Sequence, residues 1–152
     1  MTANHAQDTD EHRYTQNDGQ DAQTTGKIVK AFYSVYNALG YGFLERVYEN
    51  AMAIEVRRLG LHVVTQAPIN VYYGRDLVGQ YFADLLVEQR VLVELKAVRT
   101  MLPEHEAQLL NYLKATPCEV GLVLNFGPRP QIKRKVYGNT RKGTLAWIQA
   151  ES

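Results

Sequence analysis

The run Val91–Lys96 (VLVELK) constrains the fold most, because it is strongly apolar yet carries a glutamate and a lysine two residues apart. Successive side chains of a strand point to opposite faces, so Glu94 and Lys96 share one face. Charges within an apolar strand cost free energy unless they are paired or bound to something. The preceding strand-like segment, residues 77–87, carries its own lone acid, Asp84. Two carboxylates and a lysine on neighbouring strands predict a site for a divalent cation and a phosphate.

The order of apolar patterns predicts an α/β fold with a mixed central β-sheet flanked by helices. Helices are expected over about 27–39, 43–59 and 103–114, and strands over 61–65, 69–73, 77–87, 91–97, 120–126, 132–137 and, as a short closing element, 144–148. The helix between the strands at 91–97 and 120–126 predicts a parallel pair. The apolar spacing predicts the inward faces of the three helices, which are Ile28, Phe32, Val35 and Leu39; Leu44, Val47, Tyr48, Ala51 and Ile54; and Ala107, Leu110 and Leu113.

The polar N-terminal segment, residues 1–25, is nearly free of aliphatic side chains, so we expect it to be disordered and residues 26–152 to form one domain. Residues 1–26 carry five acids and one arginine, a net charge of −4, so the rest carries +5 of the total of +1. No run is long enough for a membrane span, and no secretory signal is visible. The single cysteine, Cys118, is interpreted as a core residue and favours a reducing, cytoplasmic setting.

The residues around the two acids support a cation site. Asp84, Glu94 and the carbonyl of Leu95 offer the oxygen ligands that a hard divalent cation takes, so Mg²⁺, or Mn²⁺, is the expected cofactor. Lys96 would orient the attacking water or stabilise charge on the phosphate. The alternative is a salt bridge between Glu94 and Lys96 on an edge strand.

Three helical residues could complete this site. Gln108 and Tyr112 are four residues apart and share one helix face, where each could hydrogen-bond a water or a phosphate. The alternative for Tyr112 is a half-buried packing role. Glu45 could be a third carboxylate ligand, directly or through water, and alternatively a first-turn acid that complements the helix dipole.

At this point the chain resembles a known family. Gly42-x-x-Glu45-x-x-Tyr48 is similar to the signature of the GxxExxY proteins, small members of the PD-(D/E)XK nuclease superfamily with a restriction-endonuclease-like core. The likeness covers residues 25–140 and also includes Tyr81-x-x-Asp84, Glu94-x-Lys96, the run from Gln108 to Tyr112 and the segment 121–127, in which Asn125-Phe126-Gly127 has no assigned role. It implies Asp84 and Glu94 as metal ligands and Lys96 as the catalytic lysine.

The sequence therefore predicts a Mg²⁺-dependent nuclease that hydrolyses phosphodiester bonds in nucleic acid, DNA in preference to RNA. The basic stretch Lys133, Arg134 and Lys135 would hold backbone phosphates. The alternative is a non-catalytic nucleic-acid-binding or protein-interaction module on the same fold. The sequence is also compatible with a homo-oligomer.

Overall fold

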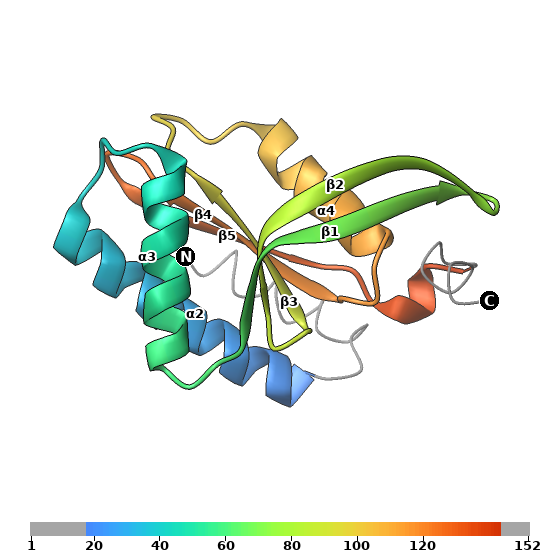
Figure 1. Cartoon of the computed structure of the whole chain (residues 1–152), viewed down its shortest axis with the longest axis horizontal. Coiled ribbons are helices and arrows are strands. Elements are labelled where there is room, and N and C mark those ends of the chain that lie inside the picture. The colour runs from blue at the N-terminus through green and yellow to red at the C-terminus, as the bar shows by residue number, and fades with distance from the viewer. Residues whose placement is uncertain (1–17, 144–152) are drawn as a thin grey trace, which may run out of the picture.

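The computed structural model describes residues 18–143, which form a five-stranded mixed sheet with helices on both faces (Figure 1). This arrangement confirms the expected α/β fold. The elements in chain order are α2 (Asp18–Leu39), α3 (Glu45–Arg58), β1 (Val63–Tyr73), β2 (Asp76–Val87), β3 (Val91–Lys96), α4 (Pro103–Lys114), β4 (Val120–Phe126), β5 (Pro130–Val136) and a 3₁₀ turn (Asn139–Arg141).

The strands lie in the order β1-β2-β3-β4-β5. All neighbours are antiparallel except β3 and β4, which α4 connects as a parallel pair, as predicted. Strands β1 and β2 form a long hairpin that reaches beyond the rest of the sheet (Figure 1). The ladder between β2 and β3 has only three residue pairs, from Leu85↔Val93 to Val87↔Val91. The pairing of β2 with β3 therefore ends at the residues next to Asp84 and Glu94.

Each face of the sheet has its own core. Val91, Val93 and Leu95 of β3 pack with residues of α2 and α3, including Phe32 and Met52. The alternate residue Leu92 packs on the other face with Val123 of β4 and with Leu109 and Leu113 of α4. Because side chains alternate along a strand, Glu94 and Lys96 belong to the face that α4 covers.

The predicted inward faces of α3 and α4 are wrong in part. The buried residues of α3 are Tyr48, Glu49, Met52, Ala53 and Val56. Leu44, Val47 and Ile54 are exposed instead. The pattern was misassigned because Glu49, an acid, belongs to the inward stripe. In α4 the inward face is Leu109, Tyr112 and Leu113, and Ala107 is exposed. Tyr112 therefore lies on the core face and not beside it.

Residues 18–25, which were expected to be disordered, form the first two turns of α2. Asp21 is buried and makes an ion pair of 3.0 Å with Arg90 in the β2–β3 turn. The prediction failed because only apolar burial was considered, whereas this segment is held by a buried ion pair and by the side chains of Thr24 and Thr25, which are also buried. Residues 1–17 and the expected element at 144–148 lie outside the described residues.

Three further expectations can be compared with the structure. The two short strands predicted at 61–65 and 69–73 are one strand, β1, which continues through Gln66 despite its positive φ of 51°. Cys118 is buried, and burial raises the pKa of its thiol to about 11, as befits a packing residue. Among the described residues, no helix is long and apolar enough to cross a membrane.

Candidate active site

Asp84 and Glu94 meet where β2 leaves β3. The backbone amide of Asp84 donates to Glu94 Oε1 (3.0 Å), and the amide of Leu95 donates to Asp84 Oδ2 (2.7 Å). Each carboxylate thus accepts a hydrogen bond from the backbone of the opposite strand, in place of the ladder bonds that end at Leu85↔Val93. The expected convergence of the two acids from adjacent strands is observed.

Glu94 is an unusually placed carboxyl group, with only 5% of its surface exposed. Burial, followed by the negative charge of Asp84, raises its pKa from 4.5 to about 8. The hydrogen bond from the Asp84 amide and the ammonium of Lys96 lower the pKa but do not outweigh these two effects. A bound cation would supply the missing positive charge. The simple alternative of a salt bridge is not observed, since no ion pair joins Glu94 and Lys96 within residues 18–143.

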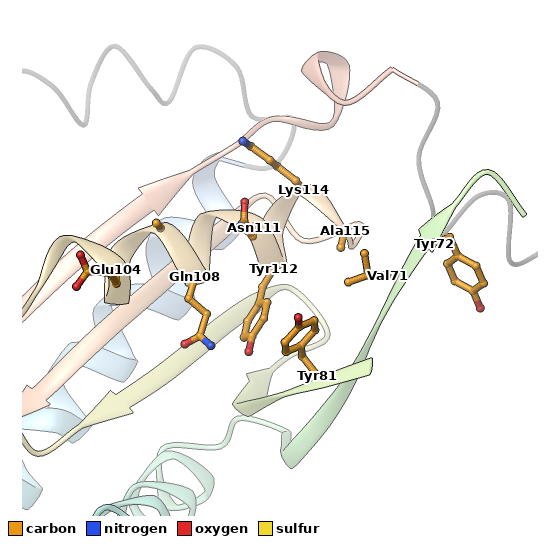
Figure 2. A pocket seen from close by; sticks show the side chains of 10 residues that line it. Val71, Tyr72, Tyr81, Glu104, Gln108, Asn111, Tyr112, Lys114 and Ala115 are labelled. Carbon is orange, nitrogen blue, oxygen red and sulfur yellow. The ribbon is translucent and has the colours of Figure 1, made fainter. Parts of the chain in front are cut away.

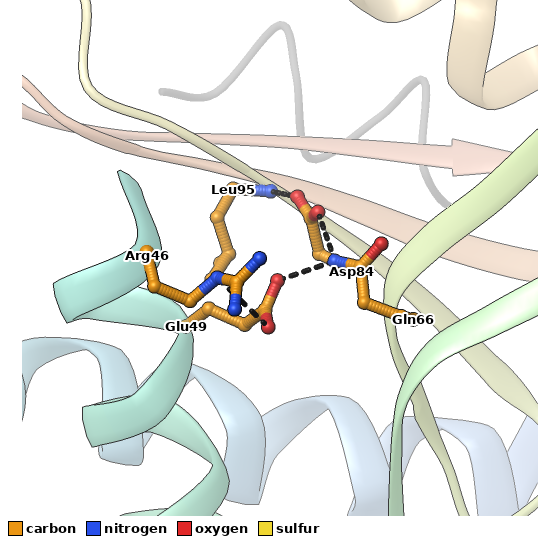
Figure 3. Close-up of polar contacts among 5 residues, drawn as sticks. All are labelled: Arg46, Glu49, Gln66, Asp84 and Leu95. Carbon is orange, nitrogen blue, oxygen red and sulfur yellow. Dashed lines mark hydrogen bonds and ion pairs between the residues drawn. The ribbon is translucent and has the colours of Figure 1, made fainter. Parts of the chain in front are cut away.

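A third acid, Glu49 of α3, is linked to Asp84 through the side chain of Gln66 (Figure 3). Gln66 Nε2 donates to Glu49 Oε1 (2.6 Å) and also lies 3.3 Å from Asp84 Oδ1. Arg46 lies 3.9 Å from the other oxygen of Glu49. Glu49 is buried, and its place in the site was missed, although its spacing of four residues from Glu45 was a signal. Gln66 had no signal, because its position depends on its positive φ.

Glu45 stands at the first position of α3 and is exposed. Its charge contributes to the raised pKa of Glu94, but less than any other group named above. Within the described part of the chain, no three Asp, Glu, His or Cys side chains are close enough to hold a metal ion together. The structure therefore does not assemble Asp84, Glu94 and Glu45 into a three-carboxylate cluster.

The residues around Glu45 explain why a glycine and a tyrosine flank it at this spacing. The hydroxyl of Tyr48 donates to the Gly40 carbonyl (2.7 Å) and accepts from the Phe43 amide (3.2 Å). Gly42 has a φ of +113°, which other residues rarely adopt. The Tyr48 ring is fully buried and stacks on Phe126 at 4.2 Å between ring centroids. The tyrosine thus fixes the turn before α3, and with it the start of the helix at Glu45.

Asn125 and Gly127 have a structural role that the sequence did not reveal. The buried Asn125 side chain accepts from the Val98 amide (3.0 Å) and donates to the Val98 carbonyl (2.9 Å). A Cβ on Gly127 would overlap that same carbonyl oxygen. The two residues therefore clamp the loop that follows Lys96, the last residue of β3, and so fix the end of the strand on which Glu94 and Lys96 lie.

Gln108 and Tyr112 lie side by side on α4 and point the same way, beside Tyr81 of β2 (Figure 2). The rings of Tyr112 and Tyr81 have centroids 5.7 Å apart. Burial, then the charges of Glu94 and Asp84, raise the pKa of Tyr112 to about 12. The negative charges of both acids thus act on Tyr112, and its hydroxyl stays protonated at neutral pH. Gln108 and Tyr112 also line a pocket of about 670 Å³, whose walls do not include the two acids.

The basic stretch of β5 does not form one surface. Lys133 and Lys135 pair with Val123 and Gly121, so they lie on the α4 face, where Lys135 makes an ion pair of 2.9 Å with Glu106. Arg134 pairs with Leu122 and therefore points to the opposite face. Because side chains alternate along a strand, three consecutive basic residues of the sequence are divided between the two faces of the sheet.

The donor set fits a hard divalent cation. Asp84, Glu94 and the Leu95 carbonyl all offer oxygen, which Mg²⁺ prefers to sulfur or imidazole. The raised pKa of Glu94 points the same way, because a bound cation would favour the ionised carboxylate that burial and Asp84 disfavour. Two side-chain oxygens and a carbonyl suffice for Mg²⁺, which usually keeps several of its waters.

Comparison with known proteins identifies the family of this chain. Residues 22–135, well over half of the chain, match the model of the PD-(D/E)XK nuclease superfamily. The chain therefore belongs to the PD-(D/E)XK nuclease superfamily. It is also similar to a solved structure described as the crystal structure of SSO0001, at 15% identity and a TM-score of 0.49, over 92% of this chain and 66% of the other. No curated protein matches the chain.

Proposed function

We propose that this protein is a nuclease that hydrolyses phosphodiester bonds in DNA with the help of Mg²⁺ or Mn²⁺. The observation that carries the proposal is the pair of hydrogen-bonded carboxylates, Asp84 and Glu94, on the face that also carries Lys96. Membership of the nuclease superfamily supports it. The Glu45 helix and its anchoring tyrosine support the finer assignment to the GxxExxY branch.

The proposed chemistry divides among six residues. A divalent cation held by Asp84, Glu94 and the Leu95 carbonyl would polarise the phosphate and lower the pKa of a bound water. Lys96 stabilises the negative charge that develops on the phosphate during in-line attack. Gln108 donates or accepts a hydrogen bond with the attacking water or a phosphate oxygen. Its neighbour on α4, the protonated Tyr112, donates a hydrogen bond from its hydroxyl to the water or to a phosphate oxygen.

Two acids of α3 have supporting roles. Glu45 stands on the first turn of α3 and lies near enough for its charge to act on Glu94, so we propose that it binds the cation through water. Glu49 holds Gln66 against Asp84 and thereby fixes the orientation of that carboxylate. Second-layer contacts of this kind commonly set the geometry of metal ligands.

Lys133 would hold a backbone phosphate. Lys135 would hold another once a phosphate replaces Glu106 as its ion-pair partner. Both lysines lie on the α4 face, the face of Glu94 and Lys96. Arg134 points to the other face, so we assign it no phosphate contact with the same strand of DNA. Lysine contacts to phosphate position a nucleic acid without reading its sequence.

The experiment is a cleavage assay with Mg²⁺, Mn²⁺ or EDTA on single-stranded, duplex and branched DNA and on RNA. Lys96→Ala should abolish cleavage and leave the affinity for DNA nearly unchanged, because one lysine adds little to a contact with many phosphates. Lys30→Ala is the matched control, since Lys30 is an exposed lysine of α2 on the opposite face. It should cleave like the wild type.

The rival function is a binding module without turnover. Such a module would show no metal-dependent cleavage of any of these substrates, and this result would overturn the nuclease proposal. Its DNA affinity would depend on basic residues such as Lys133 and not on Lys96. The expected reducing, cytoplasmic setting and a homo-oligomeric state stay predictions.

A further inference from the structure

A cavity of about 670 Å³ lies between α4 and the long β1–β2 hairpin (Figure 2). Its volume is within the range of roughly 300–1,000 Å³ that is common for small-ligand sites. Two tyrosine rings stand in its walls, Tyr81 from the hairpin and Tyr112 from α4, whereas the ring of Tyr72 points away from them (Figure 2). Aromatic walls offer flat faces on which another flat, unsaturated ring can stack.

The polar lining of the cavity is suited to a neutral occupant. The amides of Gln108 and Asn111 each offer a donor and an acceptor, which match the edge of a nucleobase in several orientations. Glu104 and Lys114 are the charged residues in the lining, one of each sign. A cavity with no excess of positive charge is a poor site for a phosphate. It is a good site for an uncharged aromatic ring that carries hydrogen-bonding groups.

The cavity adjoins the candidate active site through one shared wall. Tyr112 lines the cavity, and its ring lies 5.7 Å from that of Tyr81, which stands on β2, the strand that carries Asp84. Gln108 is likewise common to the cavity and to the proposed catalytic set. A nucleotide whose phosphate stood at the two acids would therefore have a pocket for a neighbouring base on the other side of the Tyr112 ring.

We infer that this cavity takes up one unpaired base of the substrate strand beside the phosphate that is cut. A base inside a duplex has both faces covered by its neighbours, so it must be unpaired and unstacked before a tyrosine can stack on it. The substrate class is then DNA with unpaired nucleotides at the cut, as in single strands, gaps or flaps. This inference rests on the proposed nuclease function for the position of the phosphate.

The first test compares binding of two single strands by the full chain carrying Lys96→Ala, which prevents turnover. One strand is a thymidine oligonucleotide, and the other has the same length but abasic sugars throughout. We expect the strand with bases to bind roughly 5- to 150-fold more tightly, the range that base–aromatic stacking commonly gives. Equal affinity for the two strands in fluorescence anisotropy would overturn the inference.

The second test assigns the effect to the cavity. Tyr81 is 49% exposed, so its replacement should not disturb the core. Tyr81→Ala should remove most of the preference for the strand with bases, Tyr81→Phe should retain it, and neither should change affinity for a continuous duplex. Tyr73→Ala is the matched control, because Tyr73 is 81% exposed on the same hairpin and does not line the cavity. An equal loss of affinity for both strands in Tyr81→Ala would contradict base stacking.

These binding tests fail independently of the nuclease proposal. If the wild type cleaves DNA but binds abasic strands as well as normal ones, the nuclease function stands and the base pocket is wrong. If base-dependent binding is found but no substrate is cleaved, the base pocket stands and the nuclease function is wrong.

Discussion

Replacement of Glu94 by glutamine should stabilise the protein at alkaline pH in the absence of divalent cations. The side chain is almost fully buried beside Asp84, and its pKa is raised from 4.5 to about 8. The folded protein therefore holds a proton on Glu94 in a pH range where the unfolded chain has lost it. Glutamine resembles the protonated acid in shape and keeps an oxygen that can accept from the Asp84 amide.

The sign and size follow from linkage. A raised acid pKa favours the folded state fully below pH 4.5, and this contribution is lost as the pH rises toward and through about 8. A difference of about 3.5 units at 1.36 kcal/mol per unit amounts to roughly 5 kcal/mol. The wild type should lose about that much free energy of unfolding between pH 4 and pH 9 from this group. Glu94→Gln should not lose it, so the gap between the two proteins should open above pH 5.

The assay is urea unfolding of both proteins at several pH values between 4 and 9, first in EDTA and then in Mg²⁺. Mg²⁺ should stabilise the wild type at high pH, by about 2.7 kcal/mol at a hundred times its dissociation constant, and should leave Glu94→Gln largely unaffected. Asp76→Asn, an exposed acid at the start of β2, is the control and should follow the wild type throughout. A gap that does not change with pH would refute the reasoning.

Three further stability predictions can be measured by the same unfolding assay at neutral pH. Gly26→Ala should stabilise the protein by about 0.5–1 kcal/mol, because Gly26 is exposed within α2 and a Cβ there meets no atom within 4 Å; a destabilised variant would contradict this. Tyr48→Phe should cost about 1–3 kcal/mol, because the Gly40 carbonyl and the Phe43 amide lose their partner while the ring stack is kept; an unchanged midpoint would show that the hydroxyl does not hold the turn. Gly127→Ala should cost about 1–3 kcal/mol through overlap with the Val98 carbonyl, and a neutral effect would mean that the loop moves freely.

The sequence by itself determined the fold class and the principal strand of the site. Alternation in Val91–Lys96 placed Glu94 and Lys96 on one face, and the helix between β3 and β4 required a parallel pair. Strand β4 and helix α4 have the predicted bounds. These features follow from periodicity and chain order, which are local properties that a sequence records directly.

The tertiary structure decided which side chains reach the site from elsewhere in the chain. Gln66 bridges the buried Glu49 to Asp84. This bridge depends on the positive φ of Gln66, which no sequence pattern predicts. Asn125 acts on the loop after Lys96, 27 residues away along the chain. Such contacts depend on how layers pack.

Burial of polar side chains likewise depends on contacts between distant parts of the chain. The first two turns of α2 were expected to be disordered because they lack aliphatic residues, yet Asp21 is buried against Arg90, 69 residues away. The stripe of α3 was rotated because Glu49 was counted as an outward residue. Apolar periodicity finds the inward face of an element only where burial is apolar. A buried charge is stabilised by a distant partner, and only the folded chain supplies that partner.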